Sequence, residues 1–143
     1  MDEERRFQED VEVVSKALAR KGRGEAPQIE GPKLYQKFQK ANRSPVRLAV
    51  ALRGYFLETG VIPEQKKAYE NYLKEMIDPA MEELITEEAV EKMKVLEQLG
   101  WFGGEQLESF IESARTRGKS ASLLWLLHLK EEKYGYQDYD FTL

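Results

Sequence analysis

Cysteine is absent from this sequence of 143 residues, and histidine occurs once, as His128. Without cysteine the chain has no disulfide, no thiolate nucleophile and no cysteine-ligated zinc site, and this composition suits a reducing compartment. No acidic residue precedes His128 by three or four positions, so the Glu-x-x-His spacing of helical metal bundles is missing. We therefore expect a cytoplasmic protein with no metal site, no cofactor and no catalytic residue.

Long apolar runs are also missing. His128 interrupts the longest one directly after Leu127, far short of the ~20 residues that span a bilayer. The opening residues, MDEERRFQED, contain neither an apolar core nor a cleavage site of a signal peptide. We expect neither secretion nor a membrane span.

Several chemical motifs and the signals of β-structure are absent too. No sustained alternation of polar and apolar residues predicts a strand. Gly103 and Gly104 lack the following lysine and the preceding strand of a phosphate-binding loop, and no calcium-binding loop is present. A dense acidic stretch is interpreted as a solvated helix face with pairs spaced by four residues; it comprises Glu82, Glu83, Glu87, Glu88 and Glu91.

What the sequence does contain is typical of a folded helical protein. Hydrophobic residues make up 41% and charged residues 34%, which is more apolar than disordered chains. The net charge of −4 is unevenly distributed: Lys16 to Arg53 holds ten Lys and Arg against two Glu, whereas Gly54 to Ala114 holds five Lys against fourteen acidic residues. The two halves of the chain are therefore polarised.

Helical periodicity predicts the domain organisation. Apolar residues spaced by four, three and four predict an amphipathic helix over residues 3–21, treated as an N-terminal arm (1–21); they are Phe7, Val11, Val14 and Leu18. Residues 22–31 contain three glycines and Pro27, and Pro32 follows directly, which predicts a linker. Residues 32–143 are expected to form a helical domain, and the first helix is a candidate surface for a homodimer.

Start and stop signals predict six to seven helices in total, so the fold class is all-α. Expected helix starts are Pro32, Ser44 with Pro45, Pro63 and Thr86. Expected ends or interruptions are Gly60, Asp78 with Pro79, and Gly100. The C-terminal part is expected to form stacked antiparallel helix pairs, as in helical repeats.

Glu105 to Leu129 reads as two short helices joined at a glycine. This stretch resembles the helix-turn-helix of an ankyrin repeat, in which alanine precedes the turn glycine by four residues and leucines pack the second helix. The matching residues are Ile111, Ala114, Gly118, Leu123, Leu126 and Leu127. Ser109 and Phe110 replace the threonine-proline opening, and Lys130 stands where that pattern closes with glycine. The resemblance implies a protein-binding scaffold without catalysis.

Two groups of residues are candidate binding surfaces. Aromatic residues of the C-terminal part are expected to be exposed and to contact a protein partner, or else to cover the end of the helical stack; they are Trp101, Phe102, Tyr134, Tyr136, Tyr139 and Phe141. A basic stretch could instead form a helix-turn-helix against nucleic-acid phosphates, or balance the acidic half within the molecule or a dimer; it comprises Lys33, Lys37, Lys40, Arg43, Arg47 and Arg53.

These observations favour a non-enzymatic module that binds another macromolecule. A protein partner is favoured because the chain is acidic overall and its acidic half would repel a duplex. Such a module could act as an adaptor or as an inhibitor that blocks its partner by binding. Binding of nucleic acid through the basic stretch is the alternative.

Overall fold

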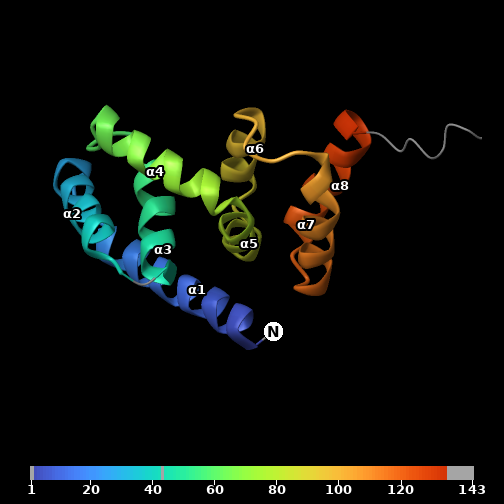
Figure 1. Cartoon of the computed structure of the whole chain (residues 1–143), viewed down its shortest axis with the longest axis horizontal. Coiled ribbons are helices and arrows are strands. Elements are labelled where there is room, and N and C mark those ends of the chain that lie inside the picture. Colours follow the sequence, from blue (N-terminus) through green and yellow to red (C-terminus); the bar gives the residue numbers. More distant parts are fainter. Residues whose placement is uncertain (1, 43, 135–143) are drawn as a thin grey trace, which may run out of the picture. The chain divides into compact units, whose positions relative to one another are not determined.

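The computed structural model describes residues 2–42 and 44–134 (Figure 1). Over these residues it contains eight α-helices, one short π-helix and no strand, which confirms the all-α class with one or two helices more than expected. None of the helices in the described ranges combines the length and the apolar character needed to cross a bilayer. The chain divides into two compact units, Met1–Glu83 and Leu84–Leu143. The boundary between them follows Glu83 and does not lie at the expected linker, residues 22–31.

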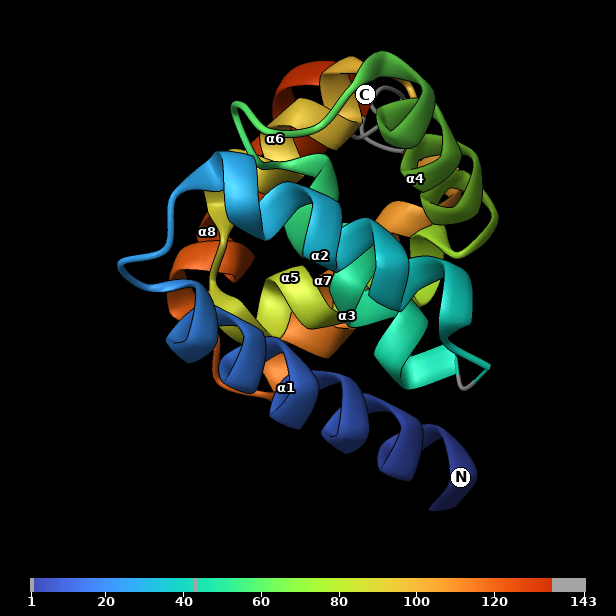
Figure 2. The same ribbon diagram turned by 90° about the vertical axis from the view of Figure 1, so that its left-hand side faces the viewer.

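The first unit is built around α3 (Ser44–Tyr55). Helices α1 (Asp2–Gly22), α2 (Pro27–Lys40) and α4 (Pro63–Glu75) all pack against it, and Figure 2 shows α1 and α2 in front of it. Every residue from Leu48 to Leu52 is buried, because neighbours cover α3 on several sides. The amphipathic stripe predicted for the first helix is the side that packs, since Val11 and Leu18 are buried.

Helix α2 begins at Pro27, so the expected start at Pro32 is wrong and part of the expected linker is helical. Pro27 occupies the first turn, where a missing N–H costs nothing, and the helix continues through Pro32. A close approach of backbones holds this first turn in place: a Cβ added to Gly31 would lie 2.6 Å from the carbonyl carbon of Gly60. Tertiary packing therefore allows α2 to start earlier than the local signal at Pro32 predicts.

The expected end of the third helix was also misplaced. Helix α3 ends at Tyr55, and Gly60 lies in the following loop with φ at +87°, a conformation that glycine adopts readily. Helix α4 begins at Pro63 as predicted. The N–H of Ile62 donates to Oε1 of Gln65 at 3.4 Å, which satisfies one backbone group at the start of α4.

The second unit contains the end of α5 (Ile77–Glu87), α6 (Val90–Gln98), α7 (Gly104–Thr116), α8 (Ser120–Leu129) and the π-helix η1 (Lys130–Tyr134). Thr86 does not start a helix, because α5 continues through it and ends only where Glu88 turns to a positive φ of 57°. The carboxylate of Glu88 then accepts the N–H of Ser122 at 2.8 Å, so it caps the start of α8.

Helices α7 and α8 form the predicted hairpin, with Gly118 at a positive φ of 68° in the turn. Ile111, Ala114 and Leu126 are buried between helices of this unit, whereas Leu127 is only half-buried. An ankyrin relationship and a stacked array stay predictions, since one hairpin is compatible with many helical folds. Three of the aromatic residues expected at the surface, Tyr136, Tyr139 and Phe141, lie outside the described residues.

A lysine cavity as the candidate functional site

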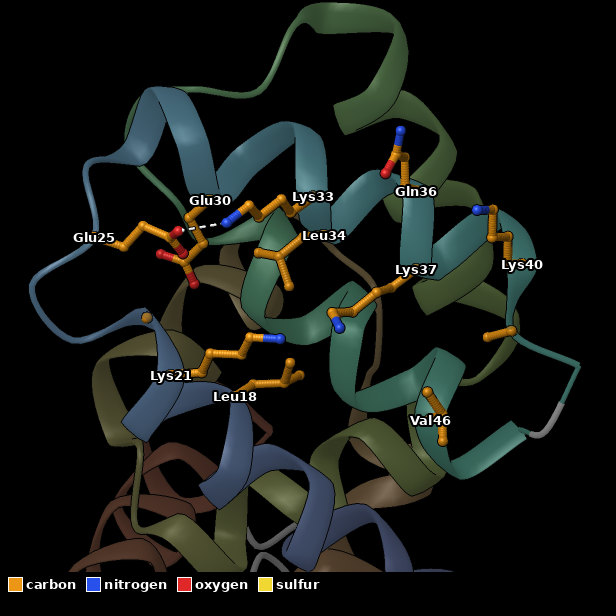
Figure 3. A pocket seen from close by; sticks show the side chains of 12 residues that line it. Leu18, Lys21, Glu25, Glu30, Lys33, Leu34, Gln36, Lys37, Lys40 and Val46 are labelled. Atoms are coloured by element: carbon orange, nitrogen blue, oxygen red, sulfur yellow. Dashed lines mark hydrogen bonds and ion pairs between the residues drawn. The ribbon is translucent and has the colours of Figure 1, made fainter.

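A cavity of about 450 Å³ opens in the first unit between α1, α2 and the start of α3 (Figure 3). Its apolar walls include Leu18, Leu34 and Val46. Its charged lining, which we call the lysine cavity, consists of Lys21, Lys33, Lys37, Lys40, Glu25 and Glu30. Four ammonium groups thus meet two carboxylates around one hollow.

Helical spacing brings the lysines together. Lys33, Lys37 and Lys40 are separated by four and three residues, so they lie along one side of α2. Lys37 and Lys40 occupy the last turn, where the helix dipole favours cations. Lys21 comes from the last turn of α1, and Figure 3 shows its side chain and that of Lys37 pointing toward each other.

Both carboxylates of the cavity are already paired. Lys33 Nζ lies 2.8 Å from Glu25 Oε2, and Arg53 of α3 donates to the buried carboxylate of Glu30. Gly22 packs directly over this second pair, because a Cβ there would lie 2.9 Å from the carboxyl carbon of Glu30. The Glu30–Arg53 pair therefore joins α1, α2 and α3 beneath one end of the cavity.

The charges that remain are uncompensated. The charge of Lys21 lowers the pKa of Lys37 below its ordinary value, and partial burial, direct contact with the Lys21 side chain and the charge of Lys33 lower it further. Over the described residues neither Lys21 nor Lys37 has a carboxylate partner. Like charges that converge in this way disfavour their own ionised form, and an anion between them would relieve the repulsion.

The candidate residues for nucleic-acid binding that the structure describes do not form one basic surface. The Arg47 guanidinium lies 3.9 Å from the centroid of the Phe38 ring and 5.1 Å from that of Tyr72, and it donates to the Phe38 carbonyl at 2.7 Å. Arg53 is held by Glu30 as described above. Arg43 lies outside the described residues. Of the basic stretch, Lys33, Lys37 and Lys40 are the ones that reach the cavity.

The aromatic candidates are tied into the second unit. Phe102 is only 5% exposed and packs edge-to-face on Phe110 with ring centroids 5.3 Å apart, so the expectation that it is exposed is wrong. The staple-like position before α7 explains this burial. Tyr134 is half-buried, and its hydroxyl donates to Glu97 at 3.4 Å. Trp101 is half-buried as well.

Sequence reasoning missed Lys21 as a site residue and missed the cavity itself. A signal was available, because Lys21 follows the stripe residue Leu18 by three positions and therefore lies on the packed side of the helix. The interpretation of residues 22–31 as a linker hid this relationship, since it separated the first helix from the second.

The only histidine provides no second site. His128 is exposed, and its Nε2 lies 3.2 Å from Glu132 one turn later on the surface. Within the described part of the chain, no group of three or more His, Asp and Glu side chains is arranged to hold a metal ion. Comparisons of the chain with models of known protein families, with curated proteins and with solved structures find no match.

Proposed function

We propose that this chain is a non-enzymatic protein-binding module that holds an anionic group of a partner protein in the lysine cavity. The observation that carries the proposal is the convergence of Lys21 and Lys37 without a facing carboxylate. Repulsion between the two ammonium groups slightly lowers the stability of the unbound protein. It raises the affinity for an anion, because the repulsion disappears on binding.

The dimensions and lining of the cavity suit a side chain presented by a segment of protein. Its volume of about 450 Å³ lies in the range of ligand-binding pockets. Leu18, Leu34 and Val46 offer apolar contact beside the ammonium groups. A polar anchor flanked by apolar walls is how binding sites combine orientation with affinity.

Nucleic acid is less well supported as the partner. Arg47, Arg53 and Lys33, three of the six candidate cations, are engaged by groups within the unit. A nucleic-acid backbone places charges at regular intervals and needs a continuous basic track. Glu25 and Glu30 interrupt such a track at one end of the cavity.

The experiment measures binding of two fluorescent probes by anisotropy: a short peptide rich in glutamate and leucine, and a duplex oligonucleotide. We expect the full chain to bind the peptide at near-physiological salt and the duplex only at low salt, where unspecific electrostatic attraction dominates. The double variant Lys21→Met and Lys37→Met keeps apolar stems of similar length and should lose peptide binding.

A charge-matched control distinguishes binding in the lysine cavity from general attraction by positively charged side chains of the protein. The double variant Lys16→Met and Lys67→Met removes the same charge from two exposed lysines that form only surface pairs with Glu12 and Glu70. It should bind the peptide as the unaltered chain does. Equal losses in both double variants, or preferential binding of the duplex at physiological salt, would refute the proposal.

A further inference from the structure

The cations of the lysine cavity narrow the choice of anionic group. They are all ammonium groups, and no arginine lines the cavity among the described residues. The planar fork of arginine matches carboxylate and phosphate alike, whereas an ammonium acts as a point charge that imposes no planar geometry and is also a common phosphate ligand. Ammonium groups as the only cations among the described lining residues can therefore donate to the tetrahedral oxygens of a phosphate.

The number of facing lysines without a carboxylate partner also favours a phosphate. Lys33 is paired with Glu25, and the ammonium group of Lys40 lies apart from the others in Figure 3, whereas Lys21 and Lys37 face each other from two different helices without a carboxylate. A carboxylate would neutralise one of these two charges. A phosphate monoester carries a charge of about −1.5 to −2 at pH 7 and has three acceptor oxygens, so it can pair with both ammonium groups at once.

The carboxylates at the edge of the cavity limit the ligand to one such group. Glu25 and Glu30 lie together at one end of the lining, as Figure 3 shows. A second phosphate next to the first would approach these carboxylates and be repelled. Leu18 and Leu34 instead offer contact to an uncharged neighbour.

We propose that the lysine cavity binds a single phosphate monoester on a side chain of the partner protein, with Lys21 and Lys37 donating to its oxygens from opposite walls. This inference rests on the proposed function and specifies the chemical group that the partner presents. The complex would then depend on phosphorylation of the partner.

The test compares three probes for binding to the full chain by calorimetry. Two are capped peptides with leucine on each side of a central residue, which is phosphoserine in one and glutamate in the other. The third is inorganic phosphate. We expect the phosphopeptide to bind at least about tenfold more tightly than the glutamate peptide, since one added charge-assisted hydrogen bond has about that effect. Inorganic phosphate should bind more weakly than the phosphopeptide because it lacks the leucines.

The pH dependence gives an independent readout. Affinity for the phosphopeptide should fall as the pH is lowered through about 6, where the phosphate loses its second charge, whereas affinity for the glutamate peptide should persist to about pH 4. The charged groups that line the cavity with Lys37 are Lys21, Lys33, Lys40, Glu25 and Glu30, and Arg53 contacts Glu30 while Arg47 contacts the Phe38 carbonyl. By NMR, bound phosphopeptide should also raise the pKa of Lys37 toward its ordinary value.

The two double variants complete the design. Lys21→Met with Lys37→Met should abolish binding of the phosphopeptide while the protein stays folded, because both positions are exposed. Lys16→Met with Lys67→Met should retain it. Equal affinity for the phosphoserine and glutamate peptides would overturn the phosphate assignment and leave the proposed function intact. If inorganic phosphate bound as tightly as the phosphopeptide, the inference that a partner protein carries the phosphate would be overturned. Retention of binding by the cavity variant would overturn both proposals.

Discussion

Replacing Gly31 by alanine tests the close approach that positions α2. In an open helix, glycine to alanine stabilises the folded state by about 1 kcal/mol through helix propensity. Here the added Cβ would lie 2.6 Å from the carbonyl carbon of Gly60 and closer still to its oxygen. Ordinary contact between carbon atoms begins at about 3.5 Å, so the two backbones would have to separate by roughly 1 Å.

Neither α2 nor the loop that contains Gly60 can move without a loss of stability. Gly60 is itself pressed against α2, since a Cβ there would lie 2.6 Å from the carbonyl carbon of Pro27. A shift of α2 would disturb Leu34 and Phe38, which are 2% and 4% exposed. Overpacking of this kind costs up to about 3 kcal/mol, so after the gain in propensity we expect a net destabilisation of about 2 kcal/mol.

The assay is urea unfolding followed by far-UV circular dichroism, with hydrogen exchange of peptides from α2 and α3 to localise the effect. With a slope of about 2 kcal/mol per molar urea, the midpoint for Gly31→Ala should fall by about 1 M. Gln39→Ala, at an exposed position of the same helix, should change stability by less than about 0.5 kcal/mol. An unchanged or raised midpoint for Gly31→Ala would refute the backbone contact.

Three further predictions concern other side chains. Leu126→Ala should cost about 2 to 5 kcal/mol because this side chain is fully buried, whereas Leu124→Ala, at a position 71% exposed, should leave the unfolding midpoint seen by tryptophan fluorescence unchanged. Glu88→Gln should lower the melting temperature at neutral pH. The backbone N–H of Ser122 lowers the pKa of Glu88, so this contribution exists above the ordinary pKa and should vanish as acid protonates the folded form; a difference that persists in acid would contradict the cap. The lowered pKa of Lys37 means that the unfolded chain holds more protons just below pH 10.5, so stability should gain from rising pH there, and Lys37→Met should abolish this gain in a series of thermal melts.

Local patterns predicted the helices well where one face decides the outcome. The apolar stripe through Val11 and Leu18 identified both the first helix and its packed side. Pro63 and Gly118 marked a start and a turn because their backbone preferences act within a few residues. These features need no knowledge of the rest of the fold.

Features that depend on distant segments could not be predicted. Helix α2 starts before Pro32 because Gly60, which lies in a later loop, accommodates its first turn. The lysine cavity needs Lys21 and Lys37 from different helices, and no spacing within one helix indicates that they meet. Likewise, Arg47 looked available for phosphate because its aromatic neighbour Tyr72 belongs to another helix.

The contact of Gly22 with the Glu30–Arg53 pair has a consequence for natural variation in this sequence. A side chain at position 22 would collide with the ends of both side chains of the pair, so the pair would have to shift once glycine is lost. Loss of one partner alone would leave the other charge buried and unpaired. Positions 22, 30 and 53 should therefore change together in related proteins, with glycine retained wherever the ion pair is retained.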